Sequence, residues 1–261
     1  MTGLLRYEWL RFSTIRSTWV MLALPIVVAA VVGWLFGHFS DTMARGNGVQ
    51  FPFATLIGVS PVLTLAAVFL SVITAQSIGQ EYRHGIIRVT LTQFPHRSRV
   101  LIAKLVLLVF VVLIMAAISM GVLWGAATVG IAPTGGSITF TSSTDGPLIL
   151  RALLYVVVFT VIAFGITLLT RVMQLGIILP IVLALLVEPI IRVIVLIATG
   201  FNGDGPPSAD NEPWILRVLP FSSGQSALDL DGTPWVGLGI FSLWCAAVLI
   251  PGWILFLRRD A

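Results

Sequence analysis

Long apolar runs alternate with short polar segments along the whole chain. The runs occupy residues 19–39, 53–78, 101–131, 149–170, 173–199 and 235–257. Each reaches or exceeds the roughly 20 residues that a helix needs to cross about 30 Å of bilayer hydrocarbon. The pattern predicts an all-α integral membrane protein with six transmembrane helices in a single domain, residues 1–261.

The first seventeen residues have the pattern of a short amphipathic helix. The apolar residues that recur at helical spacing are Leu5, Trp9, Phe12 and Ile15. A basic helix that carries Trp and Phe is typical of a helix lying on a membrane surface. We therefore expect an interfacial helix over residues 1–17. A signal peptide fits less well, because the next apolar run is longer than a usual signal core.

The polar segments between the runs differ in length and composition. Residues 40–52 and 132–148 are short and rich in Gly, Ser and Thr, which predicts irregular loops. Residues 200–234 are longer and acidic. Within them, residues 214–219 are apolar enough to dip back into the membrane surface, and a solvated loop anchored by Trp214 is the alternative. A very tight turn near residue 171 predicts that the fourth and fifth spans are antiparallel neighbours.

The basic residues indicate how the chain is oriented. With six spans and a cytoplasmic N-terminus, 11 of the 15 basic residues fall on the inner side. They are Arg6, Arg11, Arg16, Arg83, Arg88, Arg97, Arg99, Lys104, Arg171, Arg258 and Arg259. Because cytoplasmic segments carry the excess of Lys and Arg, we expect both termini in the cytoplasm and residues 200–234 outside the cell.

Composition excludes several classes of protein. Hydrophobic residues make up 57% of the chain and charged residues 10%, whereas soluble domains carry about 25% charge. The net charge of +4 does not indicate a nucleic-acid partner, because the basic residues are distributed by membrane side. The three histidines have no metal-ligand spacing, and Cys245 is the only cysteine. The excess of Arg over Lys hints at a GC-rich bacterial genome, so we expect a bacterial plasma membrane protein.

The most polar connection lies between the second and third apolar runs. Residues 79–99 carry seven charged or histidine side chains in a chain that has few. A helix-compatible stretch, residues 86–94, lies between Gly85 and Pro95, which are ordinary helix punctuation. The segment is either a solvated basic loop that fixes topology or a short helix against the membrane that is offered to a soluble partner.

These residues resemble the permeases of the ATP-binding cassette type-2 transporter family. Their first cytoplasmic loop typically reads E-x-R-x-G-T, then L, P, R and a downstream A-K. This chain has Glu81-x-Arg83-x-Gly85, with Ile86 in place of the Thr. The later matches are Leu91, Pro95, Arg97 or Arg99, and Ala103-Lys104. In that family the loop forms the coupling helix that docks on the ATPase subunit.

The resemblance implies a permease subunit whose coupling loop is the docking site of a separate ATPase subunit. The residues that it assigns to ATPase coupling are Glu81, Arg83, His84, Gly85, Arg88, Pro95 and Arg97. It further implies a homodimer or a heterodimer with a related permease, and export of a hydrophobic or amphipathic compound (drug, peptide or lipid). ATP and Mg would bind the partner, because this chain has no G-x-x-x-x-G-K-[ST] motif and no other enzyme signature. We expect no cofactor, metal or catalytic residue here.

Glu81 is the only acid among the basic residues of this loop. We expect it to bond the exposed N–H groups at the start of the short helix or an Arg of the ATPase. An exposed pair with Arg83 or Arg88 is the alternative.

Polar and small residues inside the spans give further hypotheses. Glu188 and Arg192 lie four residues apart on one helical face in the fifth span, where they either line a path or form a structural pair. Two G-x-x-x-G motifs, residues 33–37 and 121–125, allow helices to approach closely. Residues 71, 74 and 76 in the second span either touch substrate or bond neighbouring helices.

Two other classes of function fit the same spans. One is a secondary transporter or channel that needs no ATPase. The other is a non-transporting membrane scaffold or immunity protein. Association with a P-loop ATPase would separate the first hypothesis from both.

Overall fold

The computed structural model describes residues 2–14, 16–44, 50–59, 62–93, 96–198, 213–230 and 232–258. Six of its helices are long and apolar enough to cross a membrane. They are α2 (Arg16–Ala44), α4 (Val62–Arg83), α6 (Arg97–Ile131), α7 (Ser142–Thr170), the continuous stretch α8 (Met173–Val182), η2 (Leu183–Val187) and α9 (Glu188–Ala198), and α12 (Pro234–Arg258). The predicted all-α class and six candidate spans are confirmed, while the orientation in the membrane stays a prediction.

Shorter elements connect the spans. They are α1 (Thr2–Thr14), β1 (Gln50–Pro52), α3 (Phe53–Val59), α5 (Ile86–Gln93), η1 (Ala132–Thr134), β2 (Ser137–Thr139), α10 (Trp214–Val218) and α11 (Pro220–Ser226). The expectation of irregular structure over residues 40–52 and 132–148 is wrong for much of both segments. β1 and β2 pair in parallel, and α7 already begins at Ser142 because Asp145 accepts a 2.6 Å hydrogen bond from the Thr141 N–H at its start.

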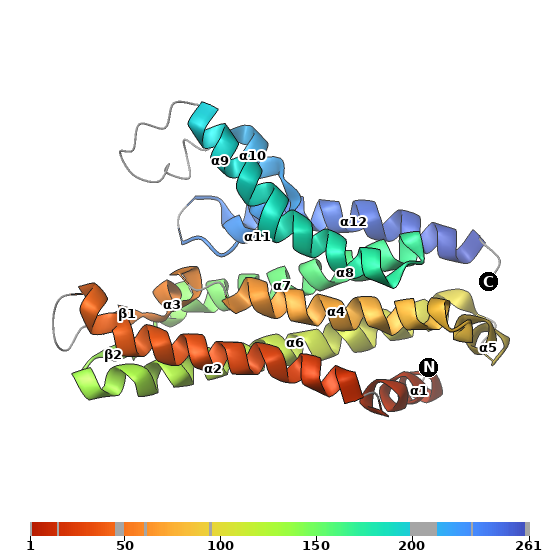
Figure 1. The fold of residues 1–261 in the computed structure, drawn as a ribbon, viewed down its shortest axis with the longest axis horizontal. Coiled ribbons are helices and arrows are strands. Elements are labelled where there is room, and N and C mark those ends of the chain that lie inside the picture. Colours follow the sequence, from red (N-terminus) through yellow and green to blue (C-terminus); the bar gives the residue numbers. More distant parts are fainter. Residues whose placement is uncertain are drawn as a thin grey trace.

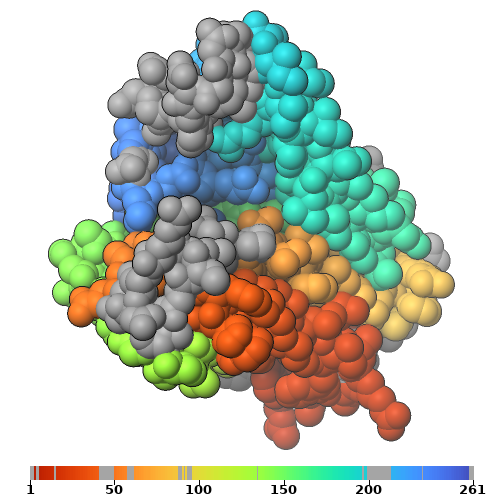
Figure 2. Space-filling model, turned by 60° about the vertical axis from the view of Figure 1, so that its left-hand side comes forward, coloured from red at the N-terminus to blue at the C-terminus, as the bar shows by residue number. Residues whose placement is uncertain are grey.

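The long helices run roughly side by side, and the short elements gather at the two ends (Figure 1). α1, α5 and the end of α12 lie at one end of the bundle, which we call the α5 end. β1, β2, α3 and α11 lie towards the other, the β1 end. α9 leans away from the bundle, and Figure 2 shows the surface hollowed between the α8–α9 stretch and α12.

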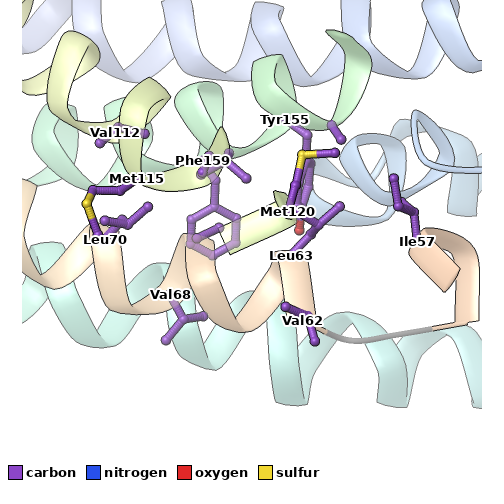
Figure 3. Packing of buried hydrophobic residues seen from close by; sticks show 14 of the residues in the cluster. Ile57, Val62, Leu63, Val68, Leu70, Val112, Met115, Met120, Tyr155 and Phe159 are labelled. Carbon is purple, nitrogen blue, oxygen red and sulfur yellow. The ribbon is translucent and has the colours of Figure 1, made fainter. Parts of the chain in front are cut away.

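The core is built around α4 and α7. In the apolar 18-residue stretch of each of these two helices, 67% of the residues are buried. The corresponding share is 17% for α8–α9 and 22% for α12. Figure 3 shows how Leu63 and Leu70 of α4 meet Met115 and Met120 of α6 and Tyr155 of α7. The other long helices therefore surround this pair and present apolar faces outward, as a lipid environment allows.

The predicted tight turn between the fourth and fifth spans is confirmed. α7 ends at Thr170, and Arg171 adopts a left-handed conformation with φ of 60°. Its N–H bonds the carbonyl of Thr167, which satisfies one of the last carbonyls of the helix. α8 begins two residues later and returns along α7, with Gly176 packed directly on Thr167.

The two G-x-x-x-G motifs have different environments. A Cβ at Gly33 or Gly37 would overlap the backbone of α6 at Leu123 or Ala127, so these glycines let α2 and α6 approach closely within one subunit. A Cβ at Gly121 or Gly125 would meet nothing within 4 Å in the described part of the chain. Of the two motifs, residues 33–37 therefore mediate close helix packing in the described structure, and residues 121–125 do not.

Gly37→Val is expected to lower the free energy of unfolding by about 1–3 kcal/mol, because two packed backbones would have to separate. Gly125→Val is the matched control in an apolar span and should unfold at nearly the wild-type temperature. Thermal unfolding of the purified proteins in detergent micelles measures both. Equal losses for the two variants would contradict the packing of α2 on α6.

Candidate functional site

A buried cluster of charged side chains joins three helices at the α5 end. Glu8 projects from the middle of α1, Glu81 from the last turn of α4, and Lys104 from the first turns of α6. These three residues are only 4%, 1% and 2% exposed. The helices bring them together because the two spans are antiparallel neighbours joined through α5, while α1 packs on α6 and reaches α4 through Arg11.

Lys104 is the centre of the cluster. Its Nζ donates hydrogen bonds of 2.7 Å to Oε2 of Glu8 and 2.9 Å to Oε1 of Glu81. It also lies 3.5 Å from the carbonyl oxygen of Ser77, one turn before Glu81. Arg11, whose side chain is 18% exposed, pairs with Glu81 from the next turn of α1.

Among the side chains that the structure describes, the cluster is electrically balanced, with two carboxylates and two cations. Burying a single charge is costly, and pairing with good hydrogen bonds offsets most of that cost. Each ion therefore depends on the others, and together they hold α1, α4 and α6. Removal of any one of them should destabilise the fold strongly. The sequence pattern did not predict this role for Glu8 or for Lys104, although Lys104 is the only lysine of the chain and lies at the edge of an apolar run.

Glu81 does not lie where the sequence analysis expects it. Its carboxylate faces the interior and bonds Lys104 and Arg11, rather than the start of α5 or the exposed residues of the loop. The reason is its position on the last turn of α4, which continues to Arg83. Glu81 thus fixes the root of the 79–99 loop and is not part of its surface.

The surface of the loop is made by the residues that follow. Arg83 and His84 are exposed, and the Nδ1 of His84 lies 2.9 Å from the carbonyl oxygen of Gln80. Gly85 has φ of +66°, which a glycine adopts without strain, and it separates α4 from α5. α5 spans Ile86–Gln93, inside the range 86–94 that the pattern marks as helical.

The remaining predicted coupling residues are only partly described. Arg97 is half-buried at the start of α6. The side chain of Arg88 and the whole of Pro95 lie outside the described residues.

The interfacial character of α1 is only partly the expected one. Trp9 is 46% exposed, as a side chain meant for the membrane surface should be, whereas Phe12 packs against the core. Glu8 is buried on the same face as Phe12, one turn earlier. Helical spacing of apolar residues alone cannot reveal a buried acid whose partner, Lys104, lies 96 residues away.

A second polar site lies at the β1 end. Glu188 is 3% exposed and accepts three hydrogen bonds from the start of α11. The donors are the N–H of Phe221 at 3.0 Å, the N–H of Ser222 at 2.5 Å and the Oγ of Ser222 at 2.9 Å. A carboxylate at this place satisfies the unpaired N–H groups of a helix start.

The bond to Glu188 holds α11 inside the bundle. Phe221 of α11 is buried, with its ring centroid 4.9 Å from Phe159 and 5.7 Å from Phe241. Tyr155 completes this aromatic cluster. The inserted part of the 200–234 segment is thus α11, while most of α10 is exposed; residues 199–212 lie outside the described part.

The pairing of Glu188 with Arg192 stays a prediction. Both oxygens of Glu188 bond α11, and Arg192 is exposed on the next turn of α9. Just before Glu188 the helix widens into the π-helical turn η2, flanked by Pro180 and Pro189. Such turns occur often at functional positions and let a helix bend.

The other polar residues that the sequence singles out in the second span differ in their contacts. The Oγ of Ser71 donates a 2.7 Å hydrogen bond to the carbonyl oxygen of Val68 in its own helix. The Oγ1 of Thr74 donates a 3.0 Å hydrogen bond to the carbonyl oxygen of Thr160 on α7. Gln76 lines a small cavity beside Lys104. Among the described residues, no group of three or more His, Cys, Asp or Glu side chains could hold a metal ion. No protein-family model matches the chain, and no curated protein matches it.

Proposed function

We propose that this chain is the permease subunit of an ATP-driven ABC exporter, acting as a homodimer or with a related permease and with separate ATPase subunits. The family resemblance of residues 79–99 supports the proposal. The observation that carries it is α5, a short helix between α4 and α6 at the same end as α1, whose root is locked to both spans by buried ions.

This arrangement suits a lever. A displacement of α5 reaches α4 through the short link at residues 84–85. Because Glu81 is bonded to Lys104 and Arg11, the end of α4 cannot move without α6 and α1. ATP binding and hydrolysis on the partner would thus shift several spans together between two states, rather than bend a single helix.

The opposite end has features that suit a gate. α8 is packed on α7, but α9 leans outward and is tied back through Glu188 to α11. The π-helical turn between α8 and α9 gives this stretch a place to bend. The expectation of a hydrophobic or amphipathic cargo, such as a drug, peptide or lipid, rests on the family resemblance.

Arg83→Glu tests the coupling role. Arg83 is exposed, so reversing its charge should leave the fold intact and weaken the docking of the ATPase at least about tenfold, through loss of a charge-assisted contact. Co-purification with the ATPase and ATP-dependent transport in reconstituted vesicles measure the effect. A P-loop ATPase from the same organism is the partner to test.

Arg258→Glu is the matched control, because Arg258 is an exposed arginine at the same end of the bundle. Gly85→Pro is a second variant, since proline cannot adopt φ of +66° and would distort the start of α5. Normal ATP-dependent transport by both well-expressed loop variants would reject the lever. Transport that proceeds without any ATPase would instead favour a secondary transporter or channel.

A further inference from the structure

A small cavity lies beside the buried ion cluster, between α1, α4 and α6. Its volume is about 30 Å³, within a wider space of about 430 Å³ that includes the open surroundings. The polar part of its wall includes Glu8, Gln76 and Gln80, and the apolar part includes Phe12, Leu107 and Leu108. A volume of roughly 10–15 Å³ already holds one water-sized group, so this cavity admits a small polar head but not a bulky one.

Glu8 leaves one hydrogen-bond acceptor unused. Its Oε2 accepts from Lys104, but Oε1 is buried and has no partner among the described residues. A buried charged acceptor without a donor is unfavourable. Because the side chain of Glu8 lines the cavity, a small rotation of the carboxylate offers Oε1 to a donor placed there.

The charge balance decides what kind of donor fits. Glu8 and Glu81 are matched by Lys104 and Arg11, so these four described side chains leave no net charge for an ion to neutralise. An ammonium group would lie beside Lys104 and Arg11, and a carboxylate or phosphate beside Glu8. Either head would also bring a further, unbalanced charge into a largely buried site. A hydroxyl group avoids both conflicts, since it can donate to Oε1 and accept from an amide of Gln76 or Gln80.

We infer that this cavity binds the hydroxyl head of a neutral amphiphile, with its alkyl chain along the apolar wall formed by Phe12, Leu107 and Leu108. The amphiphile is an aliphatic alcohol or a lipid that carries a free hydroxyl group, such as a monoacylglycerol, of which only the terminal hydroxyl group would enter the cavity. The inference does not rest on the proposed transport function and concerns a site that no coupling residue of the loop occupies.

Binding of radiolabelled decan-1-ol to the purified full chain in phosphatidylcholine nanodiscs tests the inference. Decyl methyl ether, decylamine and decanoate compete as probes with the same chain and different heads. Saturable binding is expected, with each of the three competing at least about tenfold more weakly than decan-1-ol, as expected for loss of a charge-assisted hydrogen bond. Absence of saturable binding, or an ether that competes as well as the alcohol, would overturn it.

Glu8→Gln should change the preference of the cavity for the alcohol over the ether. The amide oxygen can keep the bond to Lys104 while the NH₂ group replaces Oε1, which turns the acceptor in the cavity into a donor. The ether, which only accepts, should then compete about as well as the alcohol. An unchanged preference for the alcohol would place the ligand elsewhere and overturn the inference.

Gln76→Leu keeps the test decisive if Glu8→Gln does not fold, because Gln76 lines the cavity outside the ion cluster. It should weaken decan-1-ol binding several-fold, whereas Gln174→Leu on the exposed side of α8 should not. Equal affinities of these two variants would also overturn the inference. Competition by 1-monodecanoylglycerol would assign the site to a lipid, and binding of decan-1-ol alone would assign it to a soluble alcohol.

Discussion

Lys104→Met is expected to lower the free energy of unfolding by about 3–5 kcal/mol, the usual loss when one member of a buried ion cluster is removed. Lys104 donates to Glu8 and Glu81, and all three side chains are buried. Without it two carboxylates face each other with Arg11 as the remaining cation. Helical circular dichroism during thermal or SDS-induced unfolding of the micellar protein measures the loss.

Glu8→Gln in the Lys104→Met background restores the charge balance, because Glu81 keeps its pair with Arg11. The double variant should therefore lose clearly less stability than the sum of the two single variants. Arg83→Met is the control for removal of an exposed cation from the end of α4, and we expect a change within about 0.5 kcal/mol. Additive losses in the double variant would refute the coupling of Glu8 to Lys104.

Glu188→Ala is expected to release α11 from the bundle. Two backbone N–H groups and one hydroxyl lose their acceptor, and the N–H of Phe221 is buried, so we expect a loss of about 2–3 kcal/mol. Glu188→Gln keeps one acceptor oxygen and should lose less. Hydrogen exchange of the Phe221 and Ser222 amides measures the effect at the site itself, and both amides should lose protection.

Ser222→Ala is the control, since it removes only the hydroxyl donor and leaves both backbone bonds in place. Arg192→Gln separates the two hypotheses for Glu188. If Glu188 acts mainly through α11, Arg192→Gln should lower the free energy of unfolding only slightly. Its effect on that free energy should add to the effect of Glu188→Gln. Strongly non-additive effects of the two substitutions would support an interaction between Glu188 and Arg192. Unchanged amide protection in Glu188→Ala would reject the hydrogen bonds from Phe221 and Ser222 to Glu188.

The spans could be predicted from the sequence because length and absence of charge identify a transmembrane helix without any tertiary information. The apolar run 149–170 lies inside α7, which begins earlier at Ser142 because a polar cap, not hydropathy, determines its start. β1 and β2 could not be predicted, since each is three residues long and their pairing joins segments 87 residues apart (Gln50 and Ser137).

For the polar sites, the sequence singles out unusual residues but does not reveal their partners. Glu81 and Glu188 are conspicuous in an apolar chain, but their partners lie on other helices, beyond the reach of i,i+4 spacing. From the sequence, the expected partners of Glu81 therefore lie within the loop or on the ATPase, and the expected partner of Glu188 lies one turn away. The structure supplies Lys104 for the first and α11 for the second.

The order of the residues in the ion cluster has a consequence for biogenesis. A lysine in a span is unfavourable for insertion until it is paired or reaches the interface. Both carboxylates that bond Lys104 precede it in the chain, at positions 8 and 81. When the ribosome delivers α6 to the membrane, its two counter-ions have therefore already been synthesised, and the lysine can be neutralised as it arrives. A circular permutation that placed α1 after α6 would delay Glu8 and leave only Glu81 to meet the arriving lysine.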